Sequence, residues 1–252
     1  MSWFDEFFDE HYLGYWAQML DEERTAHELA FIRDKLELGA GAKVLDLCCG
    51  QARHAVELAK AGWDVTGLDL NEFLLERAQD AAQKAGVHVR FVQSDMRDIP
   101  FENEFDAVIN LFTAFGYFED DAENERVLES VEGCLKPGGQ FLVDHTHVLC
   151  AARDFEPYVW RQYEDGTIQV EEREFDARRV RFRTKATFIK PDGALAERCN
   201  DIRCYTCAEL CNMLAAAGLD VQEVCGGFDG SELTLESKRL IIISKKRTTG
   251  NG

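Results

Sequence analysis

Residues Val44 to Leu70 read VLDLCCGQARHAVELAKAGWDVTGLDL, and this stretch decides the fold. Val44–Leu47 is a short apolar run typical of a buried strand, and a turn of small residues around Gly50 follows it. His54–Lys60 has apolar residues spaced as on one face of a helix, and Val65–Leu70 has the composition of a second strand. The stretch therefore predicts a strand, a tight turn, a helix and a parallel strand, which is the building unit of an α/β fold.

Both strands of this unit end close to an acidic residue, Asp46 in the first and Asp69 in the second. The turn leaves backbone N–H groups open to a ligand, and the start of the helix offers the positive end of its dipole. A carboxylate after the second strand is able to accept hydrogen bonds from both hydroxyls of a ribose. A dinucleotide fold would have the pattern G-x-G-x-x-G, but Cys48 stands at the first glycine position and only Gly50 is a clear match. The unit predicts nucleoside binding, with an NAD-type oxidoreductase as one alternative.

The pattern D-x-C-C-G-x-A resembles motif I of the class I S-adenosylmethionine-dependent methyltransferases. The resemblance implies a Rossmann-like α/β fold with a seven-stranded, mostly parallel sheet whose last strand runs antiparallel. It also implies that Asp46 lies beside the methionine end of S-adenosylmethionine, Gly50 beneath the cofactor and Asp69 on its ribose. Cys48 and Ala52 replace residues that are more commonly glycine in the family. The positions of this stretch that we expect at the cofactor are Asp46, Cys48, Gly50, Arg53, Asp69 and Leu70.

Two further strands bring more candidate residues to the same edge of the sheet. Val87–Gln93 alternates as a strand does and leads into Ser94, Asp95 and Met96. In the family, an acid at this point accepts a hydrogen bond from the adenine amino group, so the resemblance implies this role for Asp95 and ring packing for Met96. Phe105–Leu111 is the fourth strand. The remaining candidates at these strand ends are Ser94, Asn110 and Leu111 for the cofactor, and Asn110, Phe115 and Tyr117 for the acceptor side.

The fifth strand is expected at Gln140–Asp144, after a turn at Leu135–Gly139. His145 and His147 come directly after it, and an imidazole at the cleft is a candidate base because its charge changes near neutral pH. A polar loop and a metal site remain open readings, but no third ligand is evident and no metal is expected. The catalytic candidates are His145, Tyr117 and Tyr15.

The N-terminal segment 2–20 is unusually rich in aromatic residues, among them Trp3, Phe4, Phe8, Tyr12 and Tyr15. Such density suggests an amphipathic cover over a cleft, although plain packing of an N-terminal helix is an alternative. In the resembling family, N-terminal helices fold over the cofactor with a tyrosine near its methionine part. The resemblance therefore implies contacts from Tyr12 to the cofactor and from Tyr15 to the reacting groups.

Residues 155–204 change character, because apolar and polar residues alternate and turn signals recur. This pattern predicts an antiparallel sheet of about four strands, inserted after strand five as a lid or a dimer contact. Arg181, Arg183 and Lys185 are expected on one solvated face, paired with glutamates. Cys207 and Cys211 follow Thr206 in a T-x-x-E capping box, which predicts a helix start rather than a metal site.

The predicted organisation has four parts. Residues 1–40 form a helical cover, 41–150 and 205–247 the cofactor-binding domain, 151–204 the inserted sheet, and 248–252 a flexible tail. The chain has 252 residues and a net charge of −19, which argues against nucleic acid as a partner, because phosphate binding needs a basic surface. Nine cysteines with irregular spacing suggest reduced thiols in a cytoplasmic protein, and no apolar run is long enough to span a membrane.

The function that the resemblance implies is methyl transfer from S-adenosylmethionine to a small-molecule acceptor, with S-adenosylhomocysteine as product. A peptide or protein acceptor and an oxidoreductase are the alternatives, as is a protein that binds the cofactor without catalysis. We expect a monomer or a homodimer.

Overall fold

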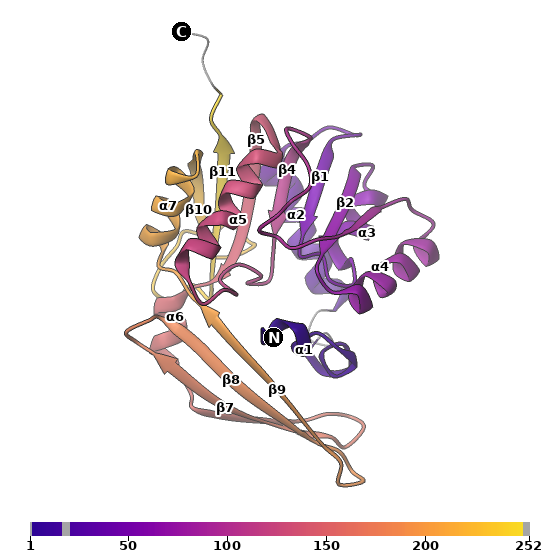
Figure 1. Cartoon of the computed structure of the whole chain (residues 1–252), viewed down its shortest axis with the longest axis vertical. Coiled ribbons are helices and arrows are strands. Elements are labelled where there is room, and N and C mark those ends of the chain that lie inside the picture. The colour runs from indigo at the N-terminus through magenta and orange to yellow at the C-terminus, as the bar shows by residue number, and fades with distance from the viewer. Residues whose placement is uncertain (1, 17–20, 249–252) are drawn as a thin grey trace.

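The computed structural model describes residues 2–16 and 21–248, and it contains two sheets (Figure 1). Sheet A has seven strands in the order β10-β11-β5-β4-β1-β2-β3, and sheet B has four in the order β6-β7-β8-β9. In sheet A, β11 runs antiparallel to both of its neighbours, while the pairs among β1 to β5 are parallel. The predicted Rossmann-like fold with an inserted antiparallel sheet is confirmed. The strands of sheet A are β1 (Lys43–Leu47), β2 (Asp64–Asp69), β3 (Arg90–Gln93), β4 (Phe105–Asn110), β5 (Leu135–Thr146), β10 (Leu219–Cys225) and β11 (Arg239–Lys246).

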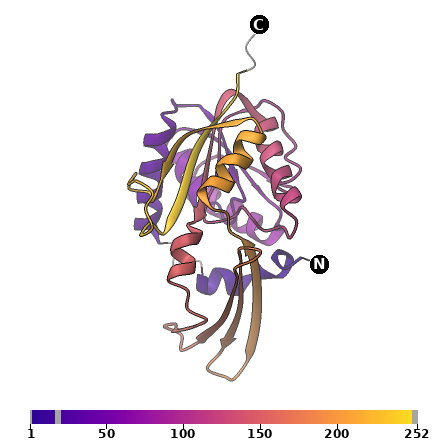
Figure 2. The same cartoon turned by 90° about the vertical axis from the view of Figure 1, so that its left-hand side faces the viewer.

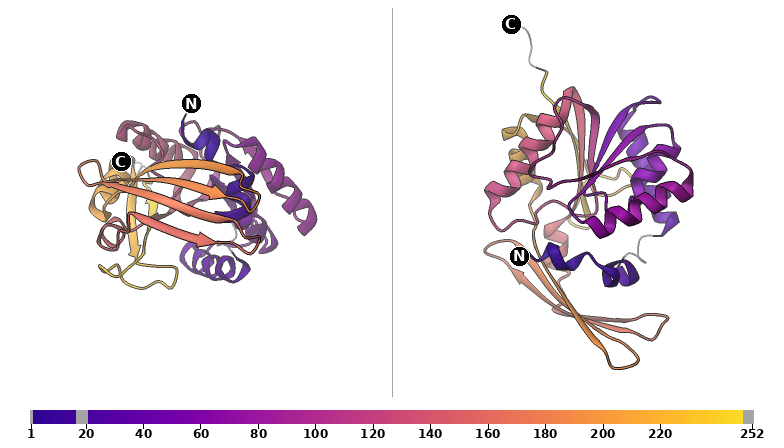
Figure 3. Two further views of the ribbon diagram at one scale, coloured as in Figure 1. Left: turned by 90° about the horizontal axis from the view of Figure 1, so that it is seen from below. Right: turned by 45° about the vertical axis from the view of Figure 1, so that its right-hand side comes forward.

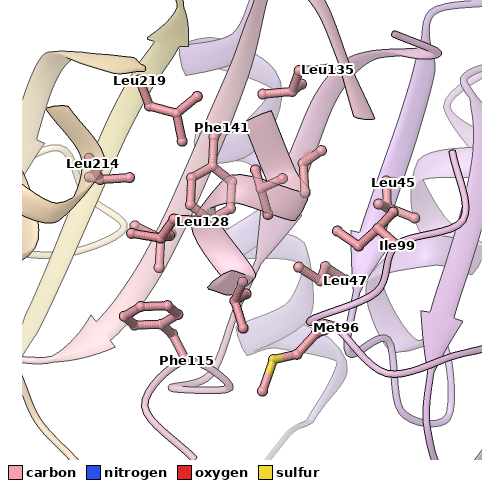
Figure 4. Close-up of a cluster of buried hydrophobic side chains, with 14 of the residues drawn as sticks. Leu45, Leu47, Met96, Ile99, Phe115, Leu128, Leu135, Phe141, Leu214 and Leu219 are labelled. Atoms are coloured by element: carbon pink, nitrogen blue, oxygen red, sulfur yellow. The ribbon is translucent and has the colours of Figure 1, made fainter. Parts of the chain in front are cut away.

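Helices cover both faces of sheet A, which gives three layers (Figure 2). On one face α2, α3 and α4 pack on a buried cluster that includes Ile32, Leu58 and Ile109. On the other face α5 and α7 enclose a second cluster with Leu128, Phe141 and Leu214, shown in Figure 4. The helix residues of both clusters repeat with the helical period and pack on strand residues such as Ile109 and Phe141, and this burial is the main stabilising term of the domain. The helices are α1 (Phe4–Phe7), the π-helix η1 (Tyr12–Trp16), α2 (Glu22–Leu36), α3 (Arg53–Lys60), α4 (Glu72–Ala85), α5 (Asp121–Cys134), α6 (Val148–Arg153) and α7 (Cys207–Ala216).

Helix starts lie where the capping residues predict them. The side chain of Asn71 accepts a hydrogen bond from Leu74 N at 3.0 Å and begins α4. Thr206 and Glu209 form the reciprocal bonds of a capping box at α7. Cys207 and Cys211 then lie one turn apart on that helix, with their Sγ atoms 3.8 Å apart. Among residues 2–16 and 21–248, no group of three or more metal-ligating side chains comes together.

Sheet B consists of β6 (Tyr158–Gln162), β7 (Ile168–Asp176), β8 (Arg181–Ile189) and β9 (Leu195–Arg203), all antiparallel. It projects below sheet A and is seen face-on in Figure 3. The prediction that Arg181 lies on a solvated face is wrong. Its side chain is buried and donates to Asp201 and to the carbonyl of Phe118. Arg181 thus connects sheet B to the loop after β4, whereas Lys185 is paired with Glu197 as an exposed cross-strand pair.

Strand β5 is longer than its sequence predicts, because the expected turn at Leu135–Gly139 belongs to the strand. Leu135 pairs with Phe105, and an irregularity separates this pair from the regular ladder that begins with Gln140 and Ala107. The strand also continues past Asp144 to Thr146, where it pairs with Arg239 of β11. His145 therefore lies inside a strand and not on a loop.

The N-terminal segment crosses the space between the two sheets (Figures 1 and 3). Asp9 forms an ion pair with Arg198 of β9, and the ring of Tyr15 stacks on Phe188 of β8 with centroids 4.8 Å apart. Residues 17–20 and 249–252 of the predicted cover and tail lie outside the described residues. Within the described ranges, no helix combines the length and the apolar character that a transmembrane span requires.

Candidate active site

A cavity of about 410 Å³ lies at the carboxyl ends of β1, β2, β3 and β4, where the parallel strands of sheet A meet the N-terminal segment. This edge of an open α/β sheet is the usual position of a ligand site. The predicted site residues that line the cavity are Tyr12, Asp46, Cys48, Gly50, Arg53, Asp69, Leu70, Ser94, Asp95, Met96, Leu111 and Tyr117. Asn110, Tyr15 and His145 do not line it.

The turn after β1 is held in a left-handed backbone conformation at three positions. Cys48 has φ 61°, Gly50 has φ 55° and Ala52 has φ 65°. Only glycine adopts such angles without steric cost, which explains why glycine is common at these positions in the family that the motif resembles. Cys48 and Ala52 adopt such angles at a cost of roughly 1–2 kcal/mol per residue, and the loop keeps its shape.

Asp69, at the end of β2, faces the cavity with both carboxylate oxygens positioned by the backbone. Its Oδ2 accepts a hydrogen bond from Gly50 N and its Oδ1 one from Asn71 N, both at 2.9 Å. Burial raises the pKa of Asp69, although these backbone N–H groups partly oppose the shift. Each oxygen still has a lone pair for a further donor, which is the arrangement that two vicinal hydroxyls require.

Asp46 is 3% exposed and its Oδ2 has no hydrogen-bond partner. Burial raises the pKa of Asp46 to about 6, even though His54 and Arg53 lie close enough to oppose the shift. A buried carboxylate oxygen without a donor is costly, and the cost disappears when a ligand supplies one. The lining of the cavity at Asp46 thus suits a ligand group that carries N–H donors and a positive charge, such as an α-ammonium.

A buried charge cluster supports the cavity from α2. Glu28 is 3% exposed and accepts from Arg53 at 2.5 Å, from His54 at 2.8 Å and from Arg24 at 2.8 Å. Burial works to raise the pKa of Glu28, but the hydrogen bonds from His54 and Arg24 outweigh it and lower this pKa to about 2. Arg53 and His54 line the cavity, and both are already paired with this carboxylate.

Asp95 and Met96 follow β3 and contribute the wall beyond Asp69. Arg97 donates from its backbone N and from its guanidinium to both oxygens of Asp95. Burial tends to raise the pKa of Asp95, but the Arg97 contacts outweigh it and lower this pKa, so the carboxylate is ionised. Met96 is buried, with its Sδ 3.5 Å from the Sγ of Cys48. Asp95 therefore remains able to accept a further hydrogen bond, in addition to those from Arg97.

Aromatic rings form the opposite side of the cavity and are referred to below as the aromatic wall. Trp3 Nε1 donates to the carbonyl of Tyr117 at 3.3 Å, which fastens the N-terminal segment to the loop after β4. Phe8 lies 6.0 Å from Tyr117 and 4.9 Å from Tyr12, measured between ring centroids. Burial raises the pKa of Tyr12 to about 12 and the pKa of Tyr117 well above its usual value. The aromatic wall consists of Phe4, Phe8, Tyr12, Phe112, Tyr117 and Phe118.

Two consecutive residues at the start of the loop after β4 have a left-handed backbone conformation, Phe112 with φ 58° and Thr113 with φ 61°. Asp144 holds both, since its Oδ2 accepts from Phe112 N at 2.8 Å and its carbonyl from Thr113 N at 3.0 Å. Arg239 donates to the same carboxylate at 2.6 Å. This anchored turn sets the position of Phe112 and, further along, of Tyr117.

Three predicted residues are placed away from the cavity. His145 is fully buried within β5, where its Nδ1 contacts the carbonyl of Thr146. Tyr15 contacts Asp165 and Thr167 at the edge of sheet B. Asn110, the last residue of β4, is buried and donates to the carbonyl of Leu47, the last residue of β1, at 3.1 Å. Of the other acceptor-side candidates, Phe115 is in the core (Figure 4) and His147 contacts the carbonyl of Ser237.

Sequence reasoning did not assign a site role to several residues that the cavity contains. Phe4 and Phe8 are prominent only as part of an aromatic segment, and Asn71 only as a helix cap. The amide of Asn71 also donates to the carbonyl of Phe8 at 2.8 Å, so it links the β2 end to the N-terminal segment. Glu28 lies behind the lining, and only its i,i+4 partner Arg24 is close in sequence, while Arg53 and His54 are distant.

Residues 44–139 match the family model described as a methyltransferase domain. YqeM of Bacillus subtilis, provisionally named a methyltransferase, is 26% identical over 211 residues, which cover 82% of this chain and 85% of YqeM. A solved S-adenosylmethionine-dependent methyltransferase from Clostridium acetobutylicum superposes with a TM-score of 0.81 over 94% of this chain and 96% of the other, at 16% identity.

CalS10 from Micromonospora echinaspora, an amino pentose methyltransferase solved with S-adenosylmethionine bound, superposes with a TM-score of 0.71 over 95% of this chain and 98% of the other, at 21% identity. At this level of identity the two structures establish the fold. The matched sequence region contains the turn after β1 and the ends of β2, β3 and β4, and these elements surround the cavity. Residues 44–139 therefore match a methyltransferase domain, and the chain as a whole has the fold of solved S-adenosylmethionine-dependent methyltransferases.

Proposed function

We propose that this protein transfers the methyl group of S-adenosylmethionine to a small-molecule acceptor, which occupies the part of the cavity beneath the N-terminal segment. The observation that carries the proposal is the position of that segment. Phe4, Phe8 and Tyr12 line the same cavity as Asp46 and Asp69, so an acceptor that reaches the cofactor has to fit under them. A concave cavity of this size, closed on one side by aromatic rings, suits a small organic molecule better than an extended polymer.

In this proposal, each residue at the strand ends contacts a different part of S-adenosylmethionine. Asp69 accepts hydrogen bonds from the ribose hydroxyls, Asp95 lies at the adenine end with Met96 against the ring, and Asp46 accepts from the α-ammonium group. Arg53 and Tyr12 lie at the methionine end beside Asp46. The cofactor supplies an activated methyl group when bound, and the chain contributes by holding donor and acceptor in line, which alone accounts for much of the acceleration in such reactions.

Further support for a small acceptor comes from CalS10, which is named an amino pentose methyltransferase and whose superposition covers 95% of this chain. Sheet B contributes no described residue to the lining of the cavity. We infer that residues 151–204 act indirectly, by supporting the N-terminal segment through the Asp9–Arg198 ion pair and the Tyr15–Phe188 stack.

Binding and turnover test the proposal in sequence. Calorimetric titration is expected to give one S-adenosylhomocysteine site per chain and no NAD binding. A panel of cellular metabolites, each offered with S-adenosylmethionine, is then expected to contain at least one compound whose addition releases S-adenosylhomocysteine. A protein that binds the cofactor product but methylates only added proteins or peptides would contradict the small-molecule assignment.

The affinity for S-adenosylhomocysteine is expected to rise about tenfold between pH 5 and pH 7. The pKa of Asp46 is about 6 in the free protein, so at pH 5 most molecules carry a neutral carboxyl group there. An α-ammonium group beside Asp46 favours the ionised form, so binding below pH 6 has to release a proton. The groups facing Asp46 are His54, Arg53 and Asp69. Calorimetry at several pH values measures the dependence.

The variant Asp46→Asn isolates the contribution of Asp46 to this pH dependence. It keeps the shape of the side chain but no longer titrates, so its affinity is expected to be weaker at pH 7 and nearly constant from pH 5 to 7. A slope that persists in Asp46→Asn would mean that a group other than Asp46 releases the proton.

A further inference from the structure

The aromatic wall faces the acceptor with rings whose electron-rich faces attract cations. Two of its rings already carry a guanidinium. Arg24 lies 5.3 Å from the centroid of Phe112, and Arg97 lies 4.2 Å from that of Phe118. Arg97 is paired with Asp95 and Glu123, whereas Arg24 shares the carboxylate of Glu28 with Arg53. In another part of the aromatic wall, the rings of Phe8 and Tyr117 lie side by side and line the cavity.

The charges around the cavity are mainly negative. Asp5 and Glu72 are exposed residues that contribute to its lining, from the N-terminal segment and from the first turn of α4. Among the described lining residues, the basic side chains are Arg53 and His54, and both are paired with Glu28. An anionic acceptor would therefore meet carboxylates and aromatic faces, whereas a cation is attracted by both.

The aromatic wall offers no base for an acceptor that has to lose a proton at the moment of attack. Burial raises the pKa of the Tyr12 and Tyr117 hydroxyls, so both are protonated near neutral pH. The candidate base His145 lies inside β5 and outside the cavity lining. An aliphatic alcohol needs such a base, but an amine carries a nucleophilic lone pair without one.

We propose that the acceptor is a small amine, drawn to the cavity as a cation by Asp5 and Glu72 and held against the rings of Phe8 and Tyr117. This inference rests on the proposed function. The ammonium ion releases one proton to water and attacks as the free base. Its nitrogen lone pair forms the new N–C bond, while the electron pair of the broken C–S bond stays on sulfur. The sulfonium becomes a neutral thioether and the methylated nitrogen becomes an ammonium, so the reacting groups carry one positive charge from the attack of the free amine to the product.

This conservation of charge distinguishes an amine from the other acceptor classes. A carboxylate acceptor would end as a neutral ester, and an alcohol would end as a neutral ether after losing its proton. A wall that stabilises a cation favours the sulfonium in both of those reactions but does nothing for their products. With an amine, the same rings stabilise the positive charge before and after it moves from sulfur to nitrogen.

Binding to the protein saturated with S-adenosylhomocysteine tests the charge preference without turnover. Choline and its uncharged isostere 3,3-dimethylbutan-1-ol serve as probes in calorimetric titrations. Choline is expected to bind at least about tenfold more tightly, and Phe8→Leu is expected to remove most of that difference. The control Phe175→Leu changes a ring of sheet B that stacks on Phe182, and it is expected to leave the difference intact. Equal binding of the two probes to the unaltered protein would overturn the proposal.

Turnover of matched acceptors provides the second arm. Amine, alcohol and carboxylate forms of the same aryl, alkyl and sugar skeletons are offered with S-adenosylmethionine, and the release of S-adenosylhomocysteine is measured. We expect the amine of at least one set to react at least about tenfold faster than its counterparts. An alcohol or a carboxylate as the preferred member would refute the amine assignment while leaving a small-molecule methyltransferase intact. Failure to bind S-adenosylhomocysteine at all would instead contradict the proposed function.

The acidic residues at the cavity are tested with Asp5→Asn combined with Glu72→Gln. The double variant is expected to lower kcat/KM for the amine several-fold at low ionic strength, with the difference shrinking in 0.5 M salt, because exposed charges are screened. Glu76→Gln is the matched control, since Glu76 is exposed on the same helix and does not line the cavity. An equal loss in the control, or a loss that salt does not reduce, would exclude the proposed role of these two carboxylates.

Discussion

Replacing Asp69 by alanine is expected to weaken S-adenosylhomocysteine binding by at least about tenfold. The carboxylate ends β2 inside the cavity, with each oxygen already fixed by a backbone N–H and free to accept one more donor. A charge-assisted hydrogen bond contributes about 1.5–3 kcal/mol, and 1.4 kcal/mol corresponds to one decade in affinity. Loss of two such bonds to the ribose, together with the anchor of the Gly50 turn, makes tenfold a lower limit. Isothermal calorimetry measures the change.

Asp64→Ala is the matched control for this experiment. Asp64 is the first residue of β2 and Asp69 the last, so the two lie at opposite ends of one strand. Asp64 is exposed, and its removal takes away an equal charge far from the cavity. The control is expected to bind with unchanged affinity. Unchanged affinity in a folded Asp69→Ala protein would reject the ribose assignment.

Replacing Gly116 by alanine is expected to destabilise the protein by about 3 kcal/mol or more. Gly116 has φ +93°, and a Cβ added there would lie 2.1 Å from the carbonyl oxygen of Arg203, where sheet B joins α7. The same backbone is held by the hydrogen bond from Arg203 N to Gly116 O at 2.8 Å, so neither chain is free to move aside. The steric clash and the backbone strain both destabilise the folded state. The midpoint of thermal denaturation is therefore expected to lie roughly 6–12 °C below that of the unaltered protein.

Gly133→Ala provides the comparison at a permissive glycine. Gly133 lies in α5, and a Cβ added there would have no neighbouring atom within 4 Å. Alanine is therefore expected to leave stability unchanged or to raise it by about 0.5–1 kcal/mol. Similar melting temperatures for Gly116→Ala and the unaltered protein would mean that the loop after β4 relaxes more easily than its contacts indicate.

The sequence predicts the edge of the sheet at which the cavity lies, because parallel strands place their carboxyl ends together. Asp46 and Asp69 lie at the ends of β1 and β2, Asp95 follows β3, and all three line one cavity. The turn after β1 is also predictable, because Gly50 and its small neighbours interrupt the apolar run between the strand and the helix. Local patterns are sufficient for these features.

Side-chain direction at the end of β5 could not be predicted in the same way. The prediction ended this strand at Asp144, but pairing with β11 extends it to Thr146, and that pairing joins residues about 95 positions apart. Because side chains alternate along a strand, the extension buries His145 instead of presenting it to the cavity. Local periodicity carries no information about where a distant partner strand stops.

Tyr15 and Arg181 illustrate the same limit for long-range contacts. Tyr15 contacts Asp165, 150 residues away, and Arg181 donates to the carbonyl of Phe118 in the loop after β4. The arrangement of the N-terminal segment between sheet B and the cavity follows from these contacts (Figure 3) and not from its aromatic composition, which is equally compatible with plain packing.

The most direct test of the central claim is the destination of a labelled methyl group. The purified protein is incubated with S-adenosylmethionine labelled in the methyl carbon and with an extract of its natural host, and the extract is then separated into small molecules and macromolecules. Asp69→Ala serves as the control at limiting cofactor. We predict label in a small-molecule product, with much less in the control. Label confined to the protein or nucleic-acid fraction, in amounts that depend on the unaltered enzyme, would contradict the account.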